Sequence, residues 1–137
     1  MKMMRTLLTV IGIAAMSSAA AAAAGFQNGP GMPDPVRAVF RKACVDCHKG
    51  KYPPQGLSLE ASSLPAAILD VPSREQPDLK LVNTGDPAAS YLLKKVKGAP
   101  DISGKRMPLS PKPALSAEDL ALLEAWIMGL KTGSPSQ

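Results

Sequence analysis

The chain is short and only mildly basic. It has 137 residues, with 16 lysines and arginines against 11 acidic residues, and a formal net charge of +5. Two of the basic residues, Lys2 and Arg5, lie in an N-terminal segment that we expect to be removed. The remaining charge is too small to indicate nucleic-acid binding. The length suits one small domain.

The aromatic content is low for a domain of this size. The chain has 1 tryptophan, 2 tyrosines and 2 phenylalanines, against 14 prolines. These residues provide little material for a hydrophobic core. Small domains of this kind usually need a covalent or metal-based support.

The N-terminus has the pattern of a secretory signal peptide. A basic head (Lys2 and Arg5) precedes an apolar run over residues 7–16 and a small-residue exit that ends in six alanines, 19–24. This order predicts a signal peptide over residues 1–24 and a periplasmic protein with no permanent membrane span after cleavage. The alternative is membrane anchoring through an uncleaved N-terminal segment. Residues 25–33, which include Met32, are expected to form a flexible N-terminal arm.

The folded domain is expected over residues 34–131, followed by a C-terminal tail, 132–137. Its first predicted helix begins with Asp34 as N-cap and Pro35 at the first helical position, and it ends near His48. Gly50 is its expected stop. One apolar face repeats at i, i+3, i+4 and i+7, formed by Val36, Val39, Phe40 and Ala43.

The middle of the domain is broken repeatedly by proline, and only a short helix over 61–69 is expected there. A second capped helix is predicted from Asp86 to Gly98, with an inward face of Tyr91, Leu92 and Val96. The last helix is predicted over 116–131, with Ser116 and Asp119 forming a capping box.

Within that last helix, one apolar stripe is expected to face the core, formed by Leu120, Leu123, Ile127 and Leu130. A stripe of small residues is expected to let another helix approach closely, formed by Ala121, Ala125 and Gly129. Met128 is expected to be a packing residue. Since no strand pattern is present, the elements predict an all-α domain.

Both cysteines and the only histidine of the chain lie in the stretch CVDCHKG, from Cys44 to Gly50. A thioredoxin-like redox pair is disfavoured, because the motif follows a helix and no strand pattern surrounds it. A structural zinc site is disfavoured, because no further Cys or His supplies a second pair of ligands. The third interpretation is that these residues form C-x-x-C-H, the attachment signature of haem c.

The spacing of this motif suits that chemistry. Positions i, i+3 and i+4 of a helical turn lie on one face, and Cys44, Cys47 and His48 occupy them. Two thioethers can then hold one covalent haem while the imidazole of His48 binds the iron as the proximal axial ligand. A backbone carbonyl in the range 53–56 is expected to accept a hydrogen bond from His48 Nδ1.

The second axial ligand cannot be histidine, since the chain has only 1. Met107 is the expected distal ligand, because it lies in a loop rich in glycine and proline just before the last helix. Met32 and Met128 are assigned to the arm and to helix packing. A thioether opposite an imidazole raises the reduction potential and fills the sixth position.

The chain resembles the class I cytochromes c, in a monohaem subgroup that carries G-D-P-x-x-S-x-L. The matching stretches are the C-x-x-C-H motif, GDPAASYL at 85–92, RMPL at 106–109 and the last helix, LSAEDLALLEAWI. The resemblance implies a small cytochrome c-like helical fold wrapped around one covalent haem, with His48 and Met107 as axial ligands. It also implies that the first and last helices cross, with Phe40 near Trp126.

These features predict an electron carrier without substrate chemistry of its own, hence not an enzyme. The alternative is a haem-based gas-binding or sensory module in which Met107 is displaced. A redox partner protein is expected, and the basic region from Lys80 to Lys112 is either a solvated face or the surface on which this partner docks. This region has seven basic residues (Lys80, Lys94, Lys95, Lys97, Lys105, Arg106 and Lys112) and two acids.

Overall fold

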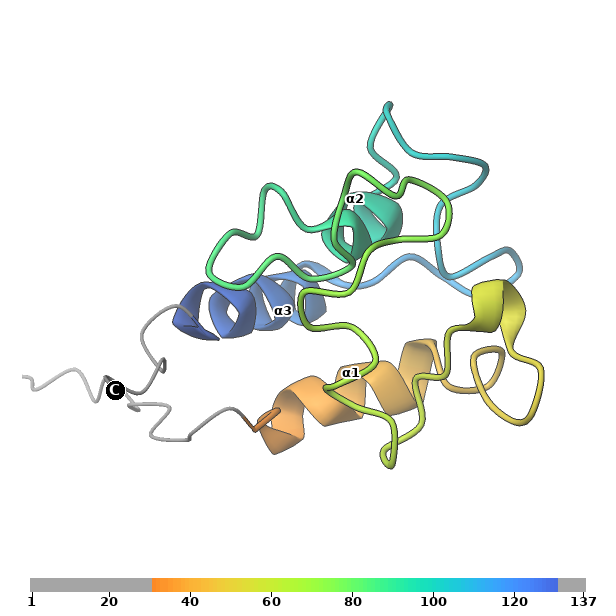
Figure 1. Ribbon diagram of the computed structural model, residues 1–137. Coiled ribbons are helices and arrows are strands. Elements are labelled where there is room, and N and C mark those ends of the chain that lie inside the picture. Colours follow the sequence, from red (N-terminus) through yellow and green to blue (C-terminus); the bar gives the residue numbers. More distant parts are fainter. Residues whose placement is uncertain (1–30, 131–137) are drawn as a thin grey trace, which may run out of the picture.

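The computed structural model describes residues 31–130. The predicted signal peptide, most of the N-terminal arm and the C-terminal tail lie outside these residues. The regular elements within the described range are the α-helices α1 (Asp34–Ala43), α2 (Tyr91–Lys97) and α3 (Ala117–Gly129) and one 3₁₀ turn, η1 (Pro54–Gly56). Between them run long irregular segments (Figure 1).

The expectation of an all-α architecture agrees with these elements. No strand is assigned between residues 31 and 130, and the two isolated bridges, Leu69 with Val82 and Pro72 with Lys80, do not build a sheet. In the same range, no helix combines the length and the apolar character that crossing a membrane requires.

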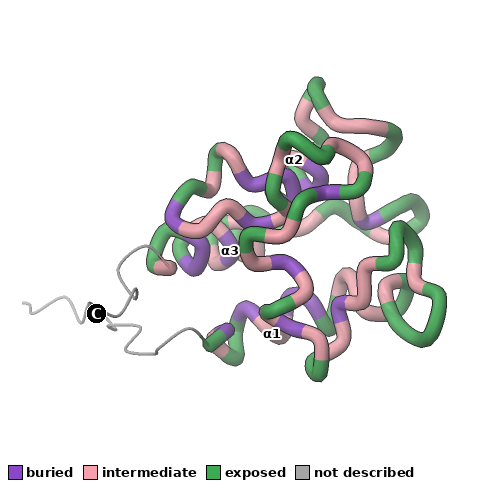
Figure 2. Tube along the Cα trace, in the orientation of Figure 1, coloured by how far each residue is buried: buried purple, intermediate pink, exposed green. Residues whose placement is uncertain are grey.

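The core forms where α1 and α3 meet. The rings of Phe40 on α1 and Trp126 on α3 lie edge to face, with centroids 6.4 Å apart and an interplanar angle of 86°. Such aromatic pairs stabilise a fold beyond the area they bury. The predicted proximity of Phe40 and Trp126 is therefore confirmed. Buried positions of α1, α2 and α3 face the interior in Figure 2.

The predicted apolar faces of the helices are confirmed as well. Val36, Val39 and Phe40 of α1 are buried, as are Tyr91, Leu92 and Val96 of α2. On α3, Leu123 and Ile127 are buried, while Leu120 and Leu130 pack against the core at its edge. A helix with one apolar stripe gains most of its stability from this packing.

The ends of α1 differ from the prediction. Pro33 is the N-cap, and Asp34 is the first helical residue instead of the cap. The helix ends at Ala43, before the cysteine motif, where the amides of Cys44 and Val45 both donate to the carbonyl of Phe40. Two donors on one carbonyl change the regular bonding pattern and end the helix there.

The second helix begins later than predicted, at Tyr91. Asp86 instead closes a preceding turn, because its Oδ1 accepts the amide of Ala89 at 3.1 Å. Ser90 separates this turn from the helix. Its hydroxyl donates to the carbonyl of Asp86 at 2.8 Å and accepts a hydrogen bond from the amide of Asn83. Side-chain bonds of this kind compete with helix formation. Gly98 ends α2 in the left-handed conformation, as predicted, with φ 71°.

The short helix expected over 61–69 is absent, and the segment is a series of turns. Leu64 donates to Glu60 and Leu69 donates to Pro65, but no continuous ladder joins the two turns. Pro65 has no amide hydrogen, and a residue before proline is steered away from the helical region. The proline therefore divides the segment.

The last helix is capped as predicted at its start, since Ser116 Oγ accepts the amide of Asp119 at 3.1 Å. Two expectations for α3 are wrong. Met128 is 56% exposed and does not pack in the core. The small-residue stripe of Ala121, Ala125 and Gly129 is exposed, because the contacts of α3 with the core use the neighbouring face of Leu123, Trp126 and Ile127.

Met32 also differs from its expected place in a flexible arm. Its side chain is buried in the main hydrophobic cluster, and its carbonyl accepts a hydrogen bond from Arg37 Nε at 3.0 Å. The chain is therefore part of the packed structure before α1 begins.

Replacing Ile127 by alanine should lower the free energy of unfolding by about 2–5 kcal/mol, because the side chain is fully buried and leaves a cavity. Replacing its exposed neighbour Met128 by alanine should change it by no more than about 0.5 kcal/mol. Chemical unfolding of both variants measures the difference. Equal losses would show that the assigned face of α3 is wrong.

Candidate functional site

The C-x-x-C-H motif forms a single turn directly after α1. The amide of His48 donates to the carbonyl of Cys44 at 3.0 Å, and the amide of Cys47 donates to the same carbonyl at 3.2 Å. An i to i+4 bond is helical in spacing, so the motif keeps one helix-like turn although α1 ends at Ala43. Both cysteines are free thiols.

The imidazole of His48 is fixed by a backbone carbonyl. Its Nδ1 lies 3.0 Å from the carbonyl oxygen of Leu57, which can only accept, so Nδ1 carries the hydrogen. This leaves the lone pair of Nε2 available to a metal. The prediction placed this carbonyl within 53–56, and the structure places it one residue later. The amide of Leu59 also donates to the carbonyl of His48, so the intervening loop is closed at its base.

A large cavity lies beside this turn, between α1, α2 and the segments that connect the helices. Its volume is about 710 Å³, within the roughly 300–1,000 Å³ of pockets that bury organic ligands. Its wall is mostly apolar and includes Cys44, Cys47 and His48 from the motif, Phe40 from α1, Leu92 and Val96 from α2, and Met107 to Leu109 from the loop before α3.

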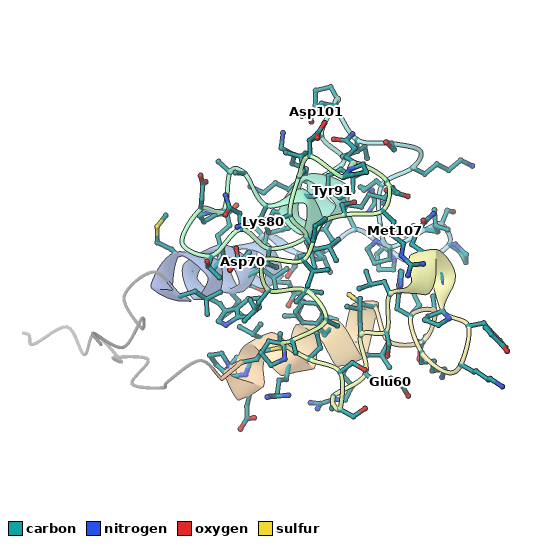
Figure 3. The ribbon with its side chains drawn as sticks, in the orientation of Figure 1. Glu60, Asp70, Lys80, Tyr91, Asp101 and Met107 are labelled. Atoms are coloured by element: carbon teal, nitrogen blue, oxygen red, sulfur yellow. The ribbon has the colours of Figure 1, made fainter. Side chains whose placement is uncertain are left out.

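Met107 reaches the cavity from a different part of the chain. It is half-buried and lies on the loop between α2 and α3, where Figure 3 labels it. Its amide donates to the carbonyl of Lys95 at 3.0 Å, which ties this point of the loop to α2. Among the described residues of the cavity wall, Met107 is the one methionine. The methionine predicted from the sequence as the distal ligand is therefore the one that lines the cavity together with His48.

The thiol of Cys44 differs from that of a dithiol oxidoreductase. Burial raises the pKa of Cys44 to about 11, against the opposing charge of Lys112. Thiols that act as redox nucleophiles have lowered pKa values. Cys44 is thus a neutral thiol at pH 7 that faces an apolar cavity, which argues further against a thioredoxin-like role.

An ion pair joins the motif to the methionine loop. Lys112 Nζ lies 2.7 Å from Asp46 Oδ2, and Asp46 is located between the two cysteines. The hydrogen bond and charge of Lys112 hold the pKa of Asp46 below its ordinary value. This pair is exposed, so its contribution to stability is small, but it shows that the two segments lie side by side.

Sequence reasoning missed a polar cluster on the same cavity wall, formed by Glu75, Tyr91 and Lys95. Glu75 Oε2 accepts hydrogen bonds from Lys95 Nζ at 2.6 Å and from Tyr91 Oη at 2.8 Å. Burial raises the pKa of Glu75, but these hydrogen bonds and the charge of Lys95 outweigh it and lower the pKa. Glu75 is 16 residues from Tyr91 and 20 from Lys95 in the sequence, so no local pattern indicated this contact.

Arg74 places a cation at the edge of the cavity. Its guanidinium occupies the space that a Cβ at Gly56 would take, and Gly56 has φ +63°. Within residues 31–130, Arg74 forms no ion pair. A carboxylate bound in the cavity could therefore meet a cation there.

The basic region predicted as a docking surface is largely neutralised within the protein. Five of its seven basic residues form ion pairs: Lys80 with Asp70, Lys94 with Asp101, Lys95 with Glu75, Lys97 with Glu124, and Lys112 with Asp46. Of the other two, Arg106 has one guanidinium nitrogen buried without a hydrogen-bond partner among the described residues. These ion pairs lower the net positive charge that the region presents to a partner.

No family model, curated protein or solved structure matches the chain. Among residues 31–130, no group of three or more His, Cys, Asp or Glu side chains is arranged to hold a metal ion by itself.

Proposed function

We propose that this protein is an exported electron carrier with one haem c. In this proposal Cys44 and Cys47 hold the haem through thioethers, and His48 and Met107 are the axial ligands of its iron. One observation carries the proposal. The two free thiols, the imidazole and the thioether come from two separate segments and line the same apolar cavity.

The residues of the cavity fit such a group. Its size and apolar wall suit a large flat organic ligand. His48 lines the cavity, and because Leu57 engages its Nδ1, Nε2 is the ring nitrogen left to bind a metal. Arg74 supplies a cation for a carboxylate at the rim. When bound, the haem supplies the one-electron redox chemistry of its iron.

The chain's own residues then determine how this chemistry is used. The cysteines would fix the position of the group, and His48 would bind it from the same turn, with its tautomer set by Leu57. Met107 would be the second protein ligand of the iron, which would leave no open site for a substrate or a gas. A filled sixth position favours electron transfer over chemistry at the metal.

The proposal includes a fold like that of the class I cytochromes c. It is supported by the contact of α1 with α3 through Phe40 and Trp126, and by a methionine loop immediately before the last helix. Periplasmic location and a redox partner protein remain part of the proposal. The first rests on the pattern of residues 1–24, and the second follows from the need of a carrier for a donor and an acceptor.

A carrier should be reduced and reoxidised reversibly by one electron, and should keep Met107 on the iron in both states. The exported protein, produced in cells that attach haem c, should therefore show no spectral change when carbon monoxide is added to its reduced form. The visible absorption spectrum checks this. Rapid formation of a carbon monoxide complex would instead support the gas-binding alternative.

Replacing Met107 by alanine should lower the reduction potential by on the order of 0.1 V, a fraction of the range that axial ligands set, about 0.8 V. It should also let carbon monoxide bind to the reduced protein, because the sixth position is open. Met32→Leu is the matched control, since Met32 is buried away from the cavity wall. Unchanged spectra and potential in Met107→Ala would exclude Met107 as the ligand.

A further inference from the structure

The loop that carries Met107 is clamped to α2 by a partly buried polar cluster, in which Lys95 and Tyr91 are the buried members. We propose that Lys95 is the positioning residue of this clamp, and that it keeps the thioether of Met107 in the cavity. This inference rests on the proposed function, because it assigns a structural cause to the retention of the axial methionine.

Lys95 contacts the loop at two points. Its ammonium Nζ donates to the carbonyl of Ser103 at 2.5 Å, and its backbone carbonyl accepts the amide of Met107 at 3.0 Å. The residue is only 9% exposed, which is unusual for lysine. A buried ammonium is tolerated only where its hydrogen bonds are satisfied. Here Glu75 and Ser103 accept two of the three hydrogen bonds that Nζ can donate.

Tyr91 completes the clamp one turn earlier on α2. Its hydroxyl accepts the amide of Ser103 at 3.0 Å and donates to Glu75 Oε2 at 2.8 Å. Both backbone groups of Ser103 are therefore held from α2. Lys95 Nζ also lies 6.0 Å from the centre of the Tyr91 ring, within the range of a cation–π contact. Figure 3 labels Tyr91 on α2, Asp101 at the far end of the loop and Met107 where the loop returns.

Further contacts hold the far part of the loop. Gln76 Nε2 donates to the carbonyl of Asp101 at 2.6 Å, and Lys94 pairs with the side chain of Asp101. The pair of Lys94 and Asp101 is exposed, with 54% of the Asp101 side chain accessible. Exposed pairs contribute little, whereas breaking a buried, hydrogen-bonded pair is costly. Lys95 is thus the contact on which the loop depends most.

The clamp acts on the axial ligand through entropy and geometry. Ordering a loop costs conformational entropy for every residue that it fixes. In this protein the hydrogen bonds to Ser103 and Met107 fix the loop in advance, so the thioether does not have to order it. Groups that orient a metal ligand without touching the metal commonly change its affinity by about 10- to 100-fold.

The test compares Lys95→Met with Lys97→Met in the exported holoprotein. Both remove one ammonium from α2 and keep an unbranched side chain, but Lys97 pairs with Glu124 of α3 and lies outside the cavity wall. Lys95→Met should raise the rate of carbon monoxide binding to the reduced protein by about 10- to 100-fold. Lys97→Met should change it by no more than about twofold.

A double variant separates positioning from general destabilisation. If Lys95 acts through Met107, then Lys95→Met should add no further change in carbon monoxide binding when Met107 is already alanine. Lys95→Arg should largely restore the slow rate, because it keeps the charge and the donors. An additive effect in the double variant would overturn the proposal.

Amide hydrogen exchange gives a readout that does not need the haem. Lys95→Met should speed the exchange of the Ser103 and Met107 amides by at least about 10-fold, while Lys97→Met leaves both slow. Tyr91→Phe, which removes only a hydroxyl, should also speed the exchange of the Ser103 amide. It replaces Lys95→Met in the test if that variant does not fold.

The outcomes separate the two proposals. Unchanged exchange in Lys95→Met and Tyr91→Phe overturns the clamp whether or not the protein carries haem. Faster exchange with unchanged carbon monoxide binding makes Lys95 a loop contact only and also overturns the positioning role. A wild-type protein without haem overturns the proposed function, and amide exchange alone then decides whether Lys95 holds the loop.

Discussion

The hydrogen bond from the amide of His48 to the carbonyl of Cys44 is the contact on which the candidate site depends. This bond, 3.0 Å long, maintains one helical turn after α1 has ended, and the two thiols and the imidazole line the same cavity. Without this turn the three groups would diverge, and no single ligand could meet all of them. The bond between His48 Nδ1 and Leu57 then fixes the ring of His48, which lines the cavity.

The second half of the site comes from a loop without regular structure, and its position has to be fixed by other means. Lys95 and Tyr91 do this with partly buried hydrogen bonds to Ser103, and Glu75 accepts a hydrogen bond from each of them. The rest of the cavity wall is mostly apolar. The two halves therefore rely on different physical effects. The motif is local and is organised by its own backbone, whereas the methionine loop is organised by long-range polar contacts with α2.

The sequence predicted what depends on local pattern and missed what depends on distant contacts. The apolar face of α1, the cap at Ser116 and the stop at Gly98 follow from spacing and residue type, and all are observed. The late start of α2 arises from hydrogen bonds of Ser90 that no periodicity reveals. Similarly, a composition count showed the basic region but not its ion pairs, and Met32 gave no sign that it is buried.

The proposed function requires a covalent bond between this chain and one haem, which mass spectrometry can detect. The protein should be exported from cells that attach haem c and analysed intact, then as peptides spanning Cys44 to His48. The intact mass should equal that of the processed polypeptide plus one haem, with the added mass on that peptide and neither thiol open to alkylation. A mass equal to the polypeptide alone, with both thiols reactive, would contradict it.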